Sequence, residues 1–513
     1  MTREITTDPA AGEPIDGAAG PDATSAPDVL VITDPRTGRP LGRYAVTDAD
    51  AVTATVERAR TAAAWWRAQG FDGRRAWLKR WKRAIARGAD DLAEVIAAET
   101  GKPIDDALLE VMLAVEHLDW AGRNARRVLR RRSVSPGIVS ANQAASVGYE
   151  PMGVVGVIGP WNYPAYTPMG SISYALAAGN AIVFKPSELT PGVGARLAAF
   201  WAELGAPEPV VQVIVGPGAT GDALVRAGVD KVAFTGSAAT ARRVMATCAQ
   251  SLTPLVVEGG GKDALIVAAD ADLPAAADFA VFGGLGNAGQ TCAGVERVLV
   301  ESPVYEQFLV EVRSRAEKLT LTGPAPAYGP MTLPRQVDIV RDQVTEAIAA
   351  GATAIVGGAD AFTGRRIAPI VLTDVPAESS AATEETFGPT LVIERVASLD
   401  EAVRRANATS YGLGASVFTA DRATGTRIAD ELRCGMVSIN SVLGFAGIGA
   451  LPFGGVGDSG FGRIHGADGL REFSRPKAVT RQRFPAPLNL LTFDRKRRDM
   501  TISRWMLRMR HGR

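Results

Sequence analysis

Hydrophobic side chains recur along this chain with two different periods. Between residues 48 and 132 they return every three to four positions, which predicts a run of amphipathic helices. From residue 151 onward, short β-branched runs alternate with helical patterns. The strands predicted here span 153–158, 181–185, 210–215, 231–235 and 254–258, and the helices span 168–178, 193–204, 219–227 and 238–250. This alternation is typical of a parallel sheet covered on both faces, with a ligand crevice beyond the carboxyl ends of its strands.

A second set of strands and helices follows. Its predicted strands span 263–267, 295–301, 353–357, 391–395, 413–419 and 436–440, and its predicted helices span 274–285, 303–318 and 334–350. The two sets meet at residues 258–261 (EGGG), where we expect a cleft between domains. The predicted fold class is therefore α/β, with two doubly wound α/β domains.

The two ends of the chain differ from its middle in composition. Residues 1–28 are rich in Ala, Pro, Gly, Asp and Thr, which predicts a disordered tail. Residues 490–513 are basic and predict an amphipathic helix, whose apolar stripe is formed by Ile502, Trp505, Met506 and Met509. Such a stripe opposite arginines is compatible with contact with an anionic membrane surface. Docking of the helix on the protein itself or on a neighbouring subunit is the favoured interpretation.

Composition narrows the class of protein. At 513 residues, the chain exceeds the roughly 250–300 residues at which single cores stop growing, so several domains are expected. A net charge of +1 removes the general electrostatic case for nucleic acid as a partner. The N-terminus lacks a secretory pattern, and no apolar run reaches about 18 residues, so we expect no transmembrane helix. Three scattered cysteines without a histidine cluster favour a reducing cytoplasm and no metal site.

The stretch 286–293 (GNAGQTCA) places Cys292 among small and polar residues. Small neighbours allow backbone N–H groups and a ligand to approach a nucleophilic thiol. A cysteine packed as a small hydrophobe is the alternative, which the polar Gln290 and Thr291 disfavour. No histidine lies near the motifs in sequence, so another group must activate the thiol or a water. Glu258 ends a predicted strand among apolar residues, where burial raises the pKa of a carboxyl group toward that of a general base.

Four further motifs follow predicted strands. Residues 159–164 (GPWNYP) offer the side-chain amide of Asn162 as a donor to an oxyanion, although an ordinary turn has the same composition. A lysine and a glutamate in 185–188 (KPSE) can hold a ribose diol. Residues 216–221 (GPGATG) fit G-x-G-x-x-G, and 234–237 (FTGS) open a helix whose N–H groups could receive a phosphate. Each motif alone is weak.

Together these motifs resemble the aldehyde dehydrogenase superfamily, over about residues 29–485. The resemblance extends to 385–389 (ETFGP), which matches a second ribose contact, and to 452–460 (PFGGVGDSG), which is similar to class-3-type and related bacterial members. The chain departs from the family pattern at Gly259, where leucine is more usual.

The resemblance implies a mechanism and a set of site residues. Cys292 attacks the aldehyde, Asn162 and the Cys292 backbone N–H stabilise the oxyanion, and Glu258 activates the water that releases the acid. It also implies a Rossmann-like cofactor domain. The expected cofactor contacts are Ile158, Pro160, Trp161, Lys185, Ser187, Glu188, Gly218, Phe234, Thr235, Gly236, Ser237, Gly259, Glu385 and Phe387. No metal takes part. NAD is preferred because Glu188 would repel a 2′-phosphate, and NADP is the alternative.

The resemblance divides the chain as well. The implied NAD-binding domain spans 29–258 and contains an oligomerisation segment at about 136–150. The implied catalytic domain spans 259–440, and residues 441–489 return to the cofactor domain and add an oligomerisation strand near 478–486. We expect a cytoplasmic homodimer or homotetramer, and peripheral membrane contact through residues 490–513 is the alternative to docking of that segment on the protein.

The substrate is inferred from one loop. Residues 442–451 (VLGFAGIGAL) fall where the family places a substrate-pocket loop and carry no charge. A carboxylated semialdehyde would favour an arginine there, so an apolar aliphatic or aromatic aldehyde is the predicted substrate. A succinate-semialdehyde or other semialdehyde dehydrogenase is the alternative. A catalytically silent binding protein is disfavoured because Cys292, Glu258 and Asn162 are all present.

Overall fold

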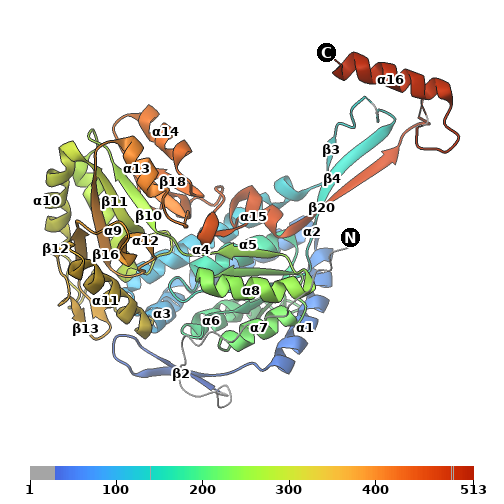
Figure 1. The fold of residues 1–513 in the computed structure, drawn as a ribbon. Coiled ribbons are helices and arrows are strands. Elements are labelled where there is room, and N and C mark those ends of the chain that lie inside the picture. The colour runs from blue at the N-terminus through green and yellow to red at the C-terminus, as the bar shows by residue number, and fades with distance from the viewer. Residues whose placement is uncertain (1–28, 139, 487, 489, 513) are drawn as a thin grey trace, which may run out of the picture.

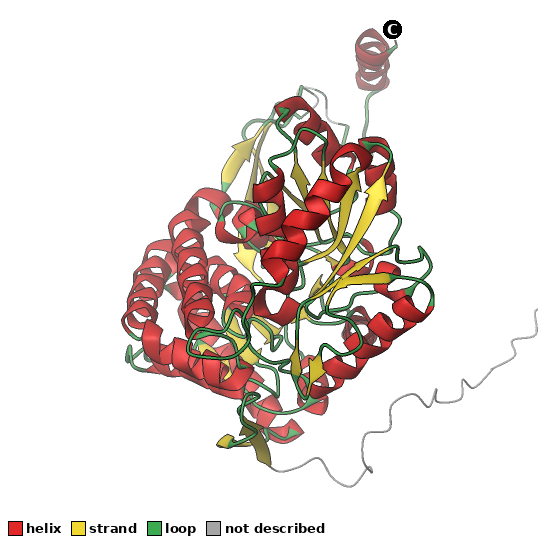
Figure 2. Ribbon diagram, turned by 90° about the vertical axis from the view of Figure 1, so that its left-hand side faces the viewer, coloured by secondary structure: helices red, strands yellow, loops and turns green. Residues whose placement is uncertain are grey.

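The computed structural model describes residues 29–138, 140–486, 488 and 490–512 (Figure 1). The predicted tail 1–28 lies outside these described residues. Figures 1 and 2 show two α/β units, an extended β arm and a C-terminal helix that stands apart from the rest. The predicted fold class is confirmed, because each unit consists of a mainly parallel sheet with helices on its faces.

A β-hairpin and four helices precede the first unit. They are β1 (Val29–Thr33), β2 (Pro40–Ala45), α1 (Ala49–Ala68), α2 (Gly70–Arg87), α3 (Ala89–Thr100) and α4 (Ile104–Leu129). The side chain of Asp48 caps α1 by accepting a hydrogen bond from the N–H of Ala51, as expected of an aspartate at this position. The predicted helical region is therefore confirmed, but it ends at Leu129 instead of 132, because the chain then enters a strand.

The first sheet has six strands in the order β19-β9-β8-β5-β6-β7. Its parallel strands are β5 (Val154–Ile158), β6 (Ala181–Lys185), β7 (Val211–Val213), β8 (Lys231–Thr235) and β9 (Leu255–Glu258), and its helices are α5 (Tyr166–Ala178), α6 (Pro191–Ala202), α7 (Gly218–Arg226) and α8 (Ala238–Ser251). These elements agree with the predictions to within three residues at each end. The antiparallel strand β19 (Gly460–Phe461) was not predicted, and it brings the C-terminal part of the chain back onto β9.

The second sheet has seven strands in the order β12-β15-β16-β11-β10-β17-β18. They are β10 (Asp263–Val267), β11 (Val295–Glu301), β12 (Thr353–Val356), β15 (Ile370–Thr373), β16 (Thr390–Val396), β17 (Gly414–Phe418) and β18 (Met436–Ile439), with helices α9 (Leu273–Leu285), α10 (Tyr305–Ala316), α11 (Pro334–Ala349), α13 (Leu399–Ala406) and α14 (Arg422–Glu431). The smaller elements are β13 (Phe362–Thr363), β14 (Arg366–Ile367), α12 (Ser380–Thr383), α15 (Gly466–Glu472) and the 3₁₀ turns η1 (Gly286–Gly289), η2 (Ser302–Val304), η3 (Gly444–Gly447) and η4 (Gly457–Ser459). Sequence analysis missed β15, α13 and α14.

A three-stranded arm extends from the first unit (Figure 1). It consists of β3 (Arg132–Val134), β4 (Gln143–Pro151) and β20 (Ser474–Gln482). β4 and β20 pair antiparallel over nine residues each, from Ser474 opposite Pro151 to Gln482 opposite Gln143. The helix α16 (Arg497–His511) follows and contains no buried residue. None of the helices in the described ranges combines the length and the apolar composition that crossing a bilayer requires.

Candidate active site

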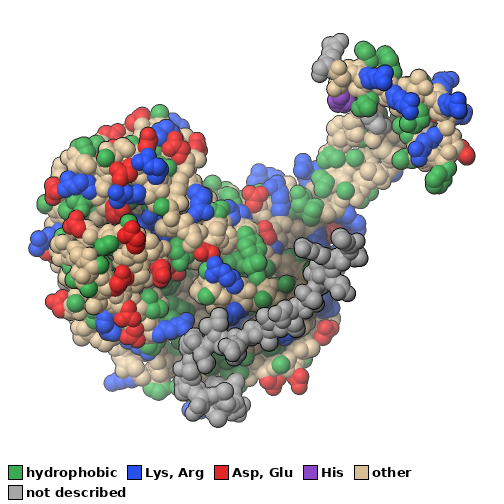
Figure 3. Space-filling view, in the orientation of Figure 1, with side chains coloured by type: hydrophobic (Ala, Val, Ile, Leu, Met, Phe, Trp, Pro, Cys, Tyr) green, Lys and Arg blue, Asp and Glu red, His purple; other side chains and the backbone are tan. Residues whose placement is uncertain are grey.

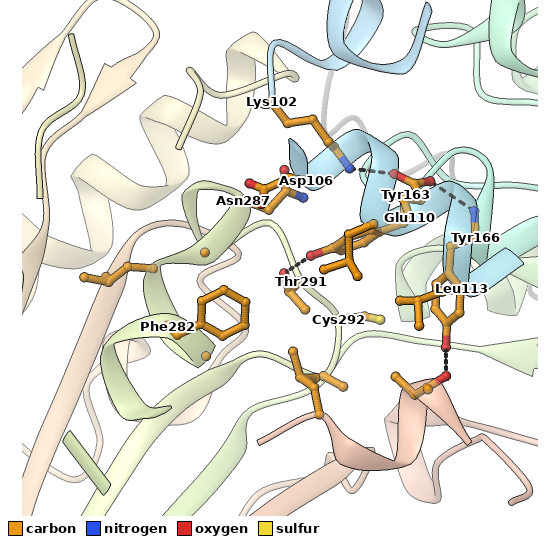
Figure 4. A pocket seen from close by; sticks show the side chains of 18 of the residues that line it. Lys102, Asp106, Glu110, Leu113, Tyr163, Tyr166, Phe282, Asn287, Thr291 and Cys292 are labelled. Atoms are coloured by element: carbon orange, nitrogen blue, oxygen red, sulfur yellow. Dashed lines mark hydrogen bonds and ion pairs between the residues drawn. The ribbon is translucent and has the colours of Figure 1, made fainter. Parts of the chain in front are cut away.

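A cavity of about 660 Å³ opens between the two units. Its wall is formed by α4, the loop after β5, the end of β9, α9 and the segment that carries Cys292 (Figure 4). Most of the wall is apolar, with side chains that include Leu109, Leu113, Val281, Phe282, Leu443 and Phe453. The predicted substrate loop contributes Leu443, Gly444, Ala446 and Gly447 to this wall.

The segment before Cys292 has an unusual backbone. Asn287 and Ala288 have φ values of 53° and 56°, in the left-handed region that non-glycine residues rarely adopt. Gly289 follows with φ 69°, and a Cβ placed there would lie 1.9 Å from the carbonyl oxygen of Gly388. This turn directs Thr291 and Cys292 into the cavity wall. Backbone strain of this kind is concentrated at functional sites.

Cys292 is partly exposed in the cavity, and its surroundings disfavour ionisation of its thiol. Burial raises its pKa to about 12, and the nearby carboxyl groups of Glu385, Asp263 and Glu258 add to the effect. The free protein therefore holds a neutral thiol at physiological pH. Nucleophilic attack by the sulfur requires a base that removes the proton as the substrate arrives.

Glu258 ends β9 and lines the same cavity. Its side chain is buried, and neither carboxyl oxygen has a hydrogen-bond partner among the described residues. Burial raises the pKa of Glu258 well above its ordinary value, while the nearby positive charge of Arg463 acts in the opposite direction. A buried carboxyl group without a partner costs stability. It is therefore a candidate for contact with a ligand or a reacting water.

Asn162 lies in the loop between β5 and α5 and is buried. Its side-chain N–H donates to the carbonyl oxygen of Gln290 at 2.9 Å, which ties the loop to the Cys292 segment. A primary amide has two N–H groups, so one remains for another acceptor. The next residue, Tyr163, lines the cavity, and its hydroxyl is 3.0 Å from the hydroxyl of Thr291 (Figure 4).

The expected cofactor residues gather at the carboxyl edge of the first sheet. Ile158 is in register with Lys185 on one side and Phe234 on the other, and Thr235 is in register with Glu258. Gly218 begins α7, and the Ser237 hydroxyl caps α8 by accepting from the N–H of Thr240. Pro160, Trp161, Ser187 and Gly236 lie in the turns that follow these strands.

Lys185 and Glu188 differ in how accessible they are at this edge. The ammonium group of Lys185 is buried and donates to the carbonyl oxygens of Pro186 at 2.9 Å and Gly216 at 2.8 Å. It lies 3.8 Å from the carboxylate of Glu188, which is half exposed. Lys185 therefore joins two strand ends, and Glu188 is the more accessible of the two for a ligand.

Glu385 comes from the second unit and reaches across to the glycines after Glu258. Its carboxyl oxygen accepts from the N–H of Gly261 at 3.2 Å, and a Cβ on Gly260 would lie 1.9 Å from it. Burial raises the pKa of Glu385 to about 8, and the negative charge of Glu296 adds to the effect. Phe387, also left-handed with φ 51°, meets the edge of Trp161 at 5.4 Å between ring centres.

Gly259, the departure from the family pattern, has a steric explanation. Its N–H donates to the carbonyl oxygen of Ser459, and a Cβ there would lie 2.7 Å from the carbonyl oxygen of Asp458. The returning C-terminal segment therefore packs directly against the backbone at this position.

In the described part of the chain, no group of three or more His, Cys, Asp or Glu side chains could hold a metal ion.

Comparison with known proteins decides between these interpretations. The profile of the Aldehyde dehydrogenase family matches residues 23–479, which is most of the chain. This protein belongs to the aldehyde dehydrogenase family. The resemblance inferred from the motifs is therefore confirmed, and the chain is an oxidoreductase of that family.

Individual members of the family are similar over nearly the whole chain. A 4,4'-diapolycopene aldehyde oxidase of a Methylomonas species is 38% identical over 465 residues, 90% of this chain and 87% of the relative. A succinate-semialdehyde dehydrogenase from Burkholderia pseudomallei is 34% identical with a TM-score of 0.84, covering 88% of this chain and 94% of that one. An NAD-dependent aldehyde dehydrogenase from Sinorhizobium meliloti is 33% identical with a TM-score of 0.85, covering 90% and 93%.

His117 and His465 are far apart along the sequence, but in this aldehyde dehydrogenase they meet at the wall of the cavity. The rings of His117 on α4 and His465 stack at 3.7 Å. His117 is bonded to the Tyr174 hydroxyl and the Ala446 carbonyl, whereas neither nitrogen of His465 has a partner among the described residues. Burial lowers the pKa of both, so they are neutral. Their separation along the sequence left no signal for this contact.

Proposed function

We propose that this protein oxidises an apolar aldehyde to the carboxylic acid, with NAD as the hydride acceptor. The observation that carries the proposal is that a thiol and a carboxyl group share one largely apolar cavity, while an amide is hydrogen-bonded to the segment that carries the thiol. The Cys292 thiol and the unpartnered Glu258 carboxyl group line that cavity, and Asn162 is hydrogen-bonded to the Cys292 segment. A nucleophile, a base and an oxyanion donor are the parts that aldehyde oxidation through a thioester requires.

The side chains divide the reaction between them. Glu258, as carboxylate, accepts the thiol proton while the Cys292 sulfur bonds to the aldehyde carbon and gives a thiohemiacetal. The free N–H of Asn162 and the backbone N–H of Cys292 stabilise the oxyanion. When bound, the dinucleotide supplies the hydride acceptor that turns this adduct into a thioester. Glu258 passes the thiol proton to solvent before the second half, so that it is again a carboxylate and takes a proton from the water that attacks the thioester. Cleavage of the C–S bond releases the acid, and Glu258 returns its proton to the leaving sulfur, which restores the thiol.

The residues at the carboxyl edge of the first sheet suit a dinucleotide. The helices α7 and α8 begin at this edge, where backbone N–H groups favour phosphate. Glu188 and Glu385 are carboxyl groups that can accept from ribose hydroxyls. The negative charge of Glu188 supports NAD over NADP because it would repel a 2′-phosphate. A lower KM for NAD than for NADP would agree, and a preference for NADP would contradict this assignment.

The cavity wall supports an apolar substrate. Of the cations that line it, Lys102 is paired with Glu110, and Arg315 with Glu311 and Asp278, whereas the exposed Lys318 forms no ion pair among the described residues. The two paired cations are compensated, and Lys318 is the cation that a substrate carboxylate could use. The relatives are named for both a diapolycopene aldehyde and succinate semialdehyde, so their names do not separate the two substrates. The apolar side chains of the cavity wall are the reason to prefer an apolar aldehyde. Succinate-semialdehyde oxidation is the second candidate.

A panel of aldehydes tests the proposal. We expect reduced cofactor to form with straight-chain alkanals, with kcat/KM rising up to about four-fold per added methylene until the cavity is full, because each buried methylene contributes about 0.8 kcal/mol. Higher kcat/KM for succinate semialdehyde than for every alkanal would overturn the substrate assignment. No product with any aldehyde would support a silent binding protein. Cys292→Ala is the control, and full turnover in this variant would exclude Cys292 as the nucleophile.

We further propose that α16 contacts an anionic bilayer surface. Figure 3 shows Lys and Arg side chains beside hydrophobic ones over this helix. Trp505, Leu507 and Met509 are 61%, 63% and 55% exposed, and the helix stands apart from its own chain (Figure 1). Basic amphipathic helices bind anionic headgroups through this combination. Full-length protein should co-sediment with vesicles that contain phosphatidylserine, and a variant ending at residue 490 should not; equal sedimentation would reject the contact.

A further inference from the structure

Lys102 and Glu110 form a completely buried ion pair beside the candidate site. The ammonium nitrogen of Lys102 is 2.8 Å from a carboxyl oxygen of Glu110, and their side chains are 1% and 0% exposed. Lys102 follows the C-terminus of α3, and Glu110 lies on α4. Neither residue belongs to the sequence motifs described above, and the mechanism above does not use them.

The other hydrogen bonds of this pair go to the loop that carries Asn162. Lys102 donates to the carbonyl oxygen of Asn162 at 2.8 Å, and its charge lies 4.2 Å above the ring of Tyr163. The second oxygen of Glu110 accepts from the N–H groups of Ala165 at 2.7 Å and Tyr166 at 3.0 Å. Figure 4 shows the Lys102 ammonium group turned toward Glu110, with Tyr163 and Cys292 nearby. The middle of the loop and its C-terminal end are thus held by one pair.

The same loop is linked to the segment of Cys292. The Asn162 carbonyl that accepts from Lys102 also accepts from the side chain of Asn287 at 3.3 Å. The Asn162 side chain donates to Gln290, two positions before Cys292. A shift of the loop would therefore move the amide relative to the sulfur.

Stability alone is a weak reason for such a pair. The desolvation of two buried charges often exceeds their attraction, and replacing a buried ion pair by apolar side chains of similar size is often neutral or stabilising. Polar contacts with the backbone of a single loop instead fix the geometry of that loop. Reacting groups need this precision, because a displacement of about 1 Å can cost about 100-fold in rate.

We propose that Lys102 and Glu110 are positioning residues that set the Asn162 amide and the Tyr163 hydroxyl relative to the Cys292 sulfur. This inference rests on the proposed function, in which Asn162 stabilises the oxyanion. The pair acts through the backbone and does not touch the substrate carbon.

The double variant Lys102→Met/Glu110→Leu tests the inference. We expect a folded protein whose NAD affinity changes little, while kcat falls about 10- to 100-fold. Both side chains line the cavity, so kcat and not the aldehyde KM is the readout. Lys82→Met/Asp119→Leu is the matched control, because this pair also involves α4 and its side chains are only 23% and 20% exposed, but it has no contact with the loop. Its kcat should stay at the wild-type value. A folded Lys102→Met/Glu110→Leu protein with wild-type kcat would overturn the proposal.

Coupling to Asn162 separates positioning from general damage. In an Asn162→Ala background, the double substitution should lower kcat by no more than about two-fold, because the group it positions is already absent. An undiminished loss in that background would reject the proposal. If the apolar pair does not fold, Lys102→Met/Glu110→Gln retains an acceptor for Ala165 and Tyr166. We expect it to lose about 10-fold in kcat, and an unchanged kcat would again contradict the inference.

A reaction without hydride transfer distinguishes this inference from the proposed function. Attack of Cys292 on 4-nitrophenyl acetate needs the thiol and an oxyanion donor but no dinucleotide. The double variant should slow release of 4-nitrophenol as much as it slows aldehyde oxidation. If the wild-type protein hydrolyses the ester but oxidises no aldehyde, the proposed function is rejected. The positioning role is then still tested by comparing ester hydrolysis by the double variant and by the wild type. Equal ester hydrolysis by variant and wild type would reject the pair.

Discussion

At the scale of single residues, burial makes the Cys292 thiol less reactive and the Glu258 carboxylate more reactive. It raises the pKa of both groups, which keeps the thiol protonated and makes the carboxylate a stronger base. A base whose pKa lies nearer to neutrality removes a proton from a thiol or a water more effectively than an ordinary glutamate does. One apolar environment therefore explains both why the thiol needs help and why Glu258 can provide it.

Replacing Glu258 by glutamine should slow both halves of the proposed reaction. We expect the first turnover of reduced cofactor and the steady rate both to fall, the steady rate about 100- to 10,000-fold, because the glutamine cannot accept a proton from the thiol or from water. The wild-type steady rate should rise with pH as Glu258 loses its proton, with a midpoint above the usual carboxylate range, and the variant should lack this rise. Rapid-mixing kinetics across pH measure both effects, and an unchanged pH profile would exclude Glu258 as the base.

The same substitution should change stability with pH. The pKa of Glu258 in the folded protein lies above its ordinary value of 4.5, so the folded state keeps a proton that the unfolded chain loses as pH rises through that value. This carboxyl group therefore lowers stability above about pH 4.5 and has no effect below it. Glu258→Gln should raise Tm at neutral pH but not in acid. Thermal unfolding at both values measures the difference, and an equal Tm at neutral pH would argue against the buried acid.

At the scale of elements, a helix or strand could be predicted where the local sequence alone specifies its structure. The strands β10 and β11 were predicted with the observed bounds, because β10 is largely apolar and β11 is rich in valine, as expected in a buried sheet. The helices α13 and α14 were missed because they are only 8 and 10 residues long and rich in charged residues, which is too short for a reliable periodic pattern. The left-handed turn at residues 287–289 could not be predicted either, since its non-glycine residues are held there by tertiary contacts.

Gly289 should tolerate no side chain in this turn. A Cβ there would lie 1.9 Å from the Gly388 carbonyl oxygen, so Gly289→Ala should destabilise the protein by about 1–3 kcal/mol or more and lower kcat. Gly228→Ala is the control, since its φ is also positive at 79° but no atom lies within 4 Å of the added Cβ. Denaturant unfolding compares the two. Equal destabilisation would show that only the backbone angle matters and that the contact with residue 388 does not.

At the scale of the whole molecule, the arm is incomplete in a single chain. The strand β20 is exposed along eight of its nine residues, and β3 is exposed throughout. Small sheets need a covered hydrophobic face for independent stability. We therefore propose that a second copy of the chain covers the arm, in a homodimer or a homotetramer. The pairing of β4 with β20 supports the oligomerisation role expected from sequence, with strand bounds of 143–151 and 474–482.

Charges on the arm should weaken this assembly. Val134 and Val479 are 39% and 40% exposed on the arm, so Val134→Lys/Val479→Lys should lower the mass measured by light scattering while the helical circular dichroism stays unchanged. Leu252→Lys, at an 88% exposed position on the body, should leave the mass as in the wild type. A wild-type protein that is monomeric at all concentrations tested would contradict the proposed assembly.

The sequence by itself determined the α/β class, most strands of both sheets and the family. These features are local, because buried parallel strands are continuous apolar runs and the motifs follow their carboxyl ends. The same reasoning identified Cys292, Glu258 and Asn162 as candidates and found the uncharged substrate loop.

Only the tertiary structure decided which distant residues surround these candidates. The stacking of His117 on His465, the ion pair between Lys102 and Glu110 and its contact with Asn162 all join segments that are independent in sequence. Burial decided the protonation states in the same way, because the pKa of Cys292 depends on apolar surroundings and on carboxyl groups from both units. Periodicity and composition report the environment of one segment, whereas the electrostatics of this cavity arise where several segments meet.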